Sequence, residues 1–111
     1  MNLTSMQCQW ILDALSSLAP CREYTVQGVD DPGEIWQLCK KLLALRKIAE
    51  KQTSVEVILT EREKDIFLQA AKEILAEKHF SFEELPAVAQ GDRATLELRW
   101  RDISHLMGRN L

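Results

Sequence analysis

The sequence is poor in the residues that define several classes of protein. It contains four glycines, three prolines and three cysteines among 111 residues. So little glycine and proline excludes a collagenous or low-complexity chain. Cys8, Cys21 and Cys39 have no Cys-x-x-Cys spacing, whereas a secreted disulfide scaffold has an even and denser set. No apolar run approaches the roughly eighteen residues that a membrane-spanning helix requires.

A strong excess of one charge is also missing. Fourteen Lys and Arg stand against seventeen Asp and Glu, which gives a formal net charge of −3. This balance argues against a mainly electrostatic binder of nucleic acid or membranes. No signal peptide is expected, because the first residues carry no cation and Gln7 and Gln9 interrupt the apolar run that follows. We therefore expect a cytoplasmic protein in which residues 1–111 form a single globular domain with its own core.

Four pairs of residues have the spacing of a helix-capping box. In such a box a Ser, Thr or Asp oxygen accepts a free backbone N–H, and a Glu or Gln three residues later bonds back. Pro32 strengthens the second start, since the first helical position needs no N–H. The four pairs are Thr4 with Gln7, Asp31 with Glu34, Thr60 with Glu63, and Ser81 with Glu84.

The periodicity of apolar residues gives the extent of these elements. It predicts helices over about 5–18, 32–51 and 61–78. The β-branched segment 54–59 is expected to be a strand, and residues 24–26 are a candidate for another short strand. Residues 81–85 are expected to form a single turn, because Pro86 cannot donate to the backbone bonds of a longer helix.

The C-terminal segment fits two structures. Leu96, Leu98 and Trp100 alternate with charged residues, which is typical of a strand, but Leu96, Trp100 and Met107 also fit one face of a helix. A strand at 54–59 needs a backbone partner, and this favours a strand at 95–100. The predicted class is therefore a predominantly helical α+β fold, with three main helices and a sheet of two or three strands. The alternative is an all-α protein with a helical C-terminus.

Chemical motifs give no support for an enzyme. The glycines form neither a phosphate-binding loop nor a nucleophile elbow. The acidic run 30–34 is interpreted as the cap of the second helix, and Cys21, next to Arg22, has no adjacent base. His79 and His105 lie in no metal-binding pattern. We expect no catalytic residue, no metal and no cofactor.

The charges are unevenly distributed along the chain. Residues 34–52 carry five cations and two anions, whereas residues 53–90 carry four cations and eight anions. Lys40, Lys47 and Lys51 fall on one face of the second predicted helix. These lysines either form a solvated face or meet phosphate or an acidic partner.

Two other residues of the second helix are candidates for partner contacts. Trp36 lies at the margin of the apolar arc, beside the lysines, and is a candidate for a partly exposed anchor. Arg46 falls within the apolar arc, where a cation must find a partner. It either pairs internally with an acid or anchors an interface.

Protein–protein binding is the leading functional hypothesis. The chain would act as a small regulator, inhibitor or adaptor of the bacterial or phage type, and it could self-associate as a homodimer. The predicted contact residues are Trp36, Lys40, Arg46, Lys47 and Lys51. The alternative is a nucleic-acid-binding module that uses the same lysines, together with the C-terminal cations Arg93, Arg99, Arg101 and Arg109.

Overall fold

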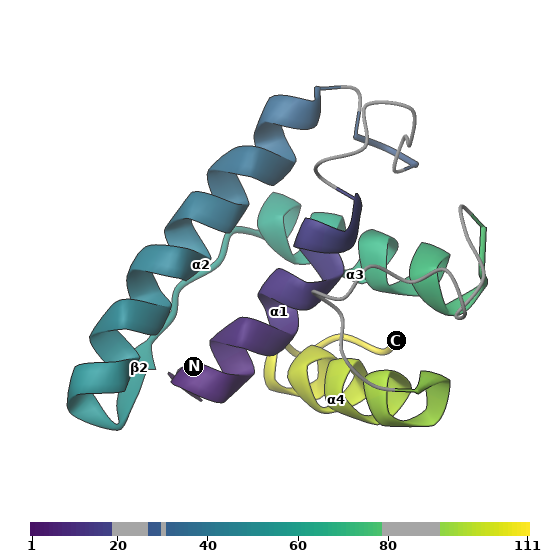
Figure 1. Ribbon diagram of the computed structural model, residues 1–111. Helices are drawn as coiled ribbons and strands as arrows, with labels where there is room; N and C mark the ends of the chain where they lie inside the picture. The colour runs from purple at the N-terminus through teal and green to yellow at the C-terminus, as the bar shows by residue number, and fades with distance from the viewer. Residues whose placement is uncertain (19–26, 30, 79–91) are drawn as a thin grey trace.

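A computed structural model describes residues 1–18, 27–29, 31–78 and 92–111 (Figure 1). It has a predominantly helical α+β fold with one small antiparallel sheet in the described residues, which confirms the predicted class. The elements are β1 (Asn2–Thr4), α1 (Ser5–Leu18), α2 (Pro32–Gln52), β2 (Ser54–Glu56), α3 (Glu61–Leu75) and α4 (Arg93–Leu106).

The first helices form where capping and periodicity predict them. α1 has the predicted bounds, α2 is one residue longer than expected, and α3 ends three residues early. Thr4 and Gln7 form the expected box, since each backbone N–H bonds to the other side chain at 2.9 and 3.2 Å. Asp31 caps α2 by accepting from the Gly33 N–H at 2.8 Å. The strand at 24–26, the turn at 81–85 and its cap, Cys21, and His79 lie outside the described residues.

The preference for a strand at 95–100 is wrong, because this segment belongs to α4. Asp92 caps the helix by accepting from the Thr95 N–H at 2.8 Å. Leu96 and Trp100 are fully buried, but Leu98 between them is 61% exposed, which fits helical rather than alternating burial. β2 finds its partner in β1 instead, with Leu3 opposite Val55.

The core is built around α1, which packs against α2, α3 and α4 (Figure 1). Five consecutive residues of α1, Ile11–Leu15, are buried. A helix that is buried on nearly all sides lies in the interior of its fold. α2 lies along one side of the molecule, so only part of its surface is covered.

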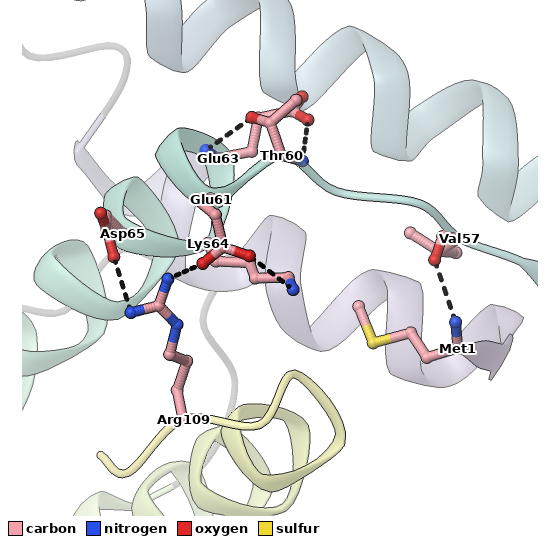
Figure 2. Close-up of polar contacts among 8 residues, drawn as sticks. All are labelled: Met1, Val57, Thr60, Glu61, Glu63, Lys64, Asp65 and Arg109. Atoms are coloured by element: carbon pink, nitrogen blue, oxygen red, sulfur yellow. Dashed lines mark hydrogen bonds and ion pairs between the residues drawn. The ribbon is translucent and has the colours of Figure 1, made fainter.

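The start of α3 is fixed by several polar contacts (Figure 2). The Thr60 hydroxyl accepts from the Glu63 N–H at 3.1 Å, and the Glu63 carboxylate accepts from the Thr60 N–H at 2.8 Å. Arg109, beyond α4, pairs with both Glu61 and Asp65. These contacts join the C-terminal segment to the first turn of α3.

Replacement of Thr60 by alanine is expected to lower the free energy of unfolding by about 1 kcal/mol. The variant leaves the Glu63 N–H without its side-chain acceptor, while the core stays intact. Urea denaturation measures the change, and Thr60→Ser is the control because it keeps the accepting hydroxyl. Equal losses in both variants would show that the cap does not stabilise α3.

Candidate functional site

The outer face of α2, defined here as Trp36, Lys40, Leu43, Lys47 and Lys51, is the candidate functional site. Each residue of a helix turns by about 100°, so steps of three or four residues keep these side chains on one side. All five are exposed, with Trp36 at 48% and Leu43 at 39%. Ile48, at the margin of this face, is 42% exposed. Apolar and cationic side chains therefore alternate along an uncovered surface.

The lysines of the outer face, Lys40, Lys47 and Lys51, have no ion pair or hydrogen bond to another described residue. Lys41 is different, since its ammonium group bonds to the Glu63 carboxylate at 2.9 Å and to the Ile58 carbonyl at 2.7 Å. The outer face therefore offers positive charge without an internal partner in the described residues.

Acidic residues of α2 at the borders of this face already have partners. Glu34 forms an ion pair with Arg62 at 2.7 Å, and Glu50 lies 3.7 Å from Arg46. Each of these carboxylates is therefore already paired with an arginine. The positive charge of the outer-face lysines faces the solvent or a binding partner.

Arg46 lies between α2 and α1 rather than on the outer face. Its guanidinium donates to the Gln9 side chain and pairs with Glu50. The Nε atom is fully buried and has no hydrogen-bond partner in the described residues. Arg46, Gln9 and Glu50 line a hollow beside the exposed side chain of Met6. The structure thus separates Arg46 from the other predicted contact residues and gives it internal partners.

The three tryptophans occupy different environments. Trp100 is fully buried, and its indole N–H donates to the Trp10 carbonyl at 2.9 Å. Trp10 is half-buried, with the Arg99 guanidinium 5.5 Å from its ring centre. Trp36 is the exposed one, as its position at the margin of the apolar arc predicted.

A buried carboxylate, Asp13, lies on α1 near Arg46. It is 5% exposed and accepts from the Gln9 amide at 2.8 Å. Burial raises the pKa of Asp13, while the bond from Gln9 and the positive charges of Arg99 and Arg46 oppose that rise. The folded protein therefore favours the protonated form of this carboxyl more than the unfolded chain does.

Because of this raised pKa, we expect Asp13→Asn to gain stability relative to the wild type as pH rises from 4 to 7. Below the unfolded pKa both side chains are neutral; above it, the wild type must ionise a carboxyl whose folded state resists ionisation. Denaturation at both pH values measures the change. The exposed carboxylate of Asp102, replaced by asparagine, is the control. A gain that shrinks with rising pH would contradict this prediction.

The C-terminal cations do not extend the outer face of α2. Arg101 pairs with Glu97 at 2.8 Å, Arg99 lies over Trp10, and Arg109 bonds to the start of α3. Arg93 is exposed in the first turn of α4, which packs on α1 and α3. The structure therefore does not join these arginines with the lysines into one basic surface.

Two exposed apolar residues near the lysines, Leu43 and Ile48, were absent from the predicted contact set. Helical geometry contained the signal for Leu43, because it follows Trp36 by seven residues and precedes Lys47 by four. Leu43 lies outside the buried face of α2, which contains Ile35, Leu38 and Leu42. The exposed side of α2 is therefore more apolar than the predicted set indicated.

The described residues show little that suits catalysis or metal binding. Burial raises the pKa values of the Cys8 and Cys39 thiols, although Arg46 opposes this at Cys8 and Ser16 at Cys39. No group of three metal-ligating side chains occurs within residues 1–18, 27–29, 31–78 and 92–111. In the same ranges, no helix has the length and apolar character needed to cross a membrane.

Comparison with known proteins found no matching family model, no similar curated protein and no similar solved structure.

Proposed function

We propose that this protein acts by binding another protein through the outer face of α2. The observation that carries the proposal is the exposure of Trp36 and Leu43 beside lysines that have no partner among the described residues. Tryptophan is enriched among the residues that contribute most to binding energy, and charges complementary to those of the partner give an interface its specificity. The expected partner presents an acidic surface with apolar side chains within it.

A different protein is favoured over a second copy as the ligand of this face. Two copies of α2 packed face to face would place lysines against lysines, which is repulsive. The acids at the start of α3 are already used, since Glu61, Glu63 and Asp65 pair with cations of the same chain. Self-association through the outer face is therefore not part of the proposal.

A protein ligand is also favoured over nucleic acid. The outer face carries three lysines that the C-terminal arginines do not extend, and a net charge of −3 weakens long-range attraction to a polyanion. The exposed Trp36 and Leu43 add apolar area that phosphates would not use. A regulator, inhibitor or adaptor in the cytoplasm fits these features, and the buried free thiols of Cys8 and Cys39 suit a reducing compartment.

Site-specific photo-crosslinking tests the proposal. A benzophenone amino acid is placed at position 43 on the outer face, and at Leu98 on α4 as a matched exposed control. We expect irradiation of a native lysate to give an adduct with one acidic protein at position 43 and none at 98. The triple variant Lys40→Glu, Lys47→Glu, Lys51→Glu should abolish the adduct, because it reverses the charge that attracts the partner.

Other products of this experiment would overturn the proposal. A nuclease-sensitive adduct would indicate nucleic-acid binding, and an adduct between two copies of the chain would indicate self-association. Equal labelling from positions 43 and 98 would show that the outer face binds nothing specific.

A further inference from the structure

We infer that the partner element bound by the outer face of α2 is an amphipathic helix with alternating apolar and acidic side chains. This inference rests on the proposed function and names the form of the ligand. The contact line of α2 has the order apolar, cation, apolar, cation, cation: Trp36, Lys40, Leu43, Lys47, Lys51. A complementary element must offer an acid opposite each lysine and an apolar side chain opposite Trp36 and Leu43.

The spacing of the contact line favours a helical ligand over an extended one. Four steps of three or four residues join Trp36 to Lys51, so the mean step along α2 is about 5.6 Å at 1.5 Å per residue. A second helix repeats its side chains with the same steps. The side chains on one face of a strand repeat at about 6.8 Å, so a strand would be out of register by about 5 Å at the far end.

Backbone hydrogen bonding favours the same ligand. An extended segment lying on a helix finds no backbone donors or acceptors there, because α2 uses its own within the helix. A helical ligand satisfies its backbone bonds internally and contributes only side chains. Since α2 lies along one side of the molecule (Figure 1), a ligand of about four turns can lie along this line without meeting the other described helices.

The lysines determine the charge pattern of the ligand helix. Lys40 lies between Trp36 and Leu43, and Lys47 lies between Leu43 and Lys51, so these lysines share one line with the apolar residues. An anionic membrane surface would be matched by the opposite arrangement, with apolar residues on one face and lysines at its margins. A ligand that interleaves acids with leucines matches the order on α2, with no lysine left in apolar contact.

Two synthetic helical peptides of equal composition test the inference. In the first peptide, glutamates and leucines alternate at steps of three and four along one face. In the second, the leucines stay on that face and the glutamates move to the opposite face. Fluorescence anisotropy measures the affinity of each labelled peptide for the intact protein. We expect the alternating peptide to bind at least about ten-fold more tightly than the segregated one.

Charge reversal at one lysine tests whether a particular glutamate of the peptide faces it. Lys47→Glu should weaken binding of the alternating peptide by about ten-fold, and a peptide with lysine in place of the facing glutamate should restore it. Lys72→Glu on α3 is the matched control, since it makes the same charge change at an exposed site on another helix. Equal losses of affinity in both variants would show that only the net charge of the protein matters, and they would overturn the inference.

Different results would contradict the helical ligand and the proposed function. Equal affinity for both peptides would overturn the helical, alternating ligand, and tighter binding to anionic phospholipid vesicles than to either peptide would do the same. Protein binding through α2 would still stand if position 43 gave its specific adduct. Loss of that adduct would remove the proposed function itself.

Discussion

Replacement of Trp100 by alanine is expected to lower the free energy of unfolding by about 3–5 kcal/mol. Trp100 is the largest of the fully buried side chains among the described residues, and it lies where α4 packs against α1. The variant leaves a cavity and also removes the indole N–H that donates to the Trp10 carbonyl. A loss of this size is a large fraction of the stability of an ordinary domain, so part of the population is expected to unfold.

Chemical denaturation measures the loss, and Leu98→Ala is the control. Leu98 belongs to the same helix but is 61% exposed, so its truncation should change the free energy of unfolding by less than about 0.5 kcal/mol. Trp100→Phe should lie between the two, because it keeps a ring in the core but loses the N–H. If Trp100→Ala were as stable as Leu98→Ala, the docking of α4 on α1 would be wrong.

The second large loss of unfolding free energy is expected at Leu42 of α2, next to the exposed Leu43. Leu42 is fully buried and Leu43 is 39% exposed. Leu42→Ala should cost about 3 kcal/mol of unfolding free energy, because it opens a cavity in the core. Leu43→Ala makes the same chemical change about 100° further around the helix, at an exposed position, and should cost less than about 0.5 kcal/mol.

The same two variants distinguish an effect on folding from an effect on binding. Leu43→Ala should weaken the contact with the alternating peptide while leaving the denaturation curve unchanged, since its side chain belongs to the outer face. Leu42→Ala should shift the curve, and its folded fraction should bind normally. For both variants, fluorescence anisotropy measures the affinity for the peptide and chemical denaturation measures the free energy of unfolding. A normal affinity for Leu43→Ala would remove Leu43 from the contact surface.

Local chemistry accounts for the parts of the fold that the sequence predicted. Thr4, Asp31 and Thr60 each bond to a backbone N–H within three residues, so the helix starts depend on neighbours in the chain. The apolar period of α2 correctly placed Leu42 in the core and Trp36 at its margin. Such features need no knowledge of distant residues.

The features that the sequence did not predict depend on distant contacts. β1 has three residues, too few for a pattern, and it forms because Leu3 is buried and lies opposite Val55. The competition between strand and helix at 95–100 was settled by a buried site for Trp100 against α1. The outer face could be predicted only in part, because the exposure of Leu43 depends on where the other helices pack.

The central position of α1 has a consequence for the order of events during synthesis. α1 leaves the ribosome before each of the helices that cover it, and α4 follows it by roughly eighty residues. Until then its apolar sides have no native partner, and an isolated helix of this length is marginal in water. The native packing around α1 is therefore complete only after α4 has been synthesised, and until then the apolar sides of α1 favour aggregation.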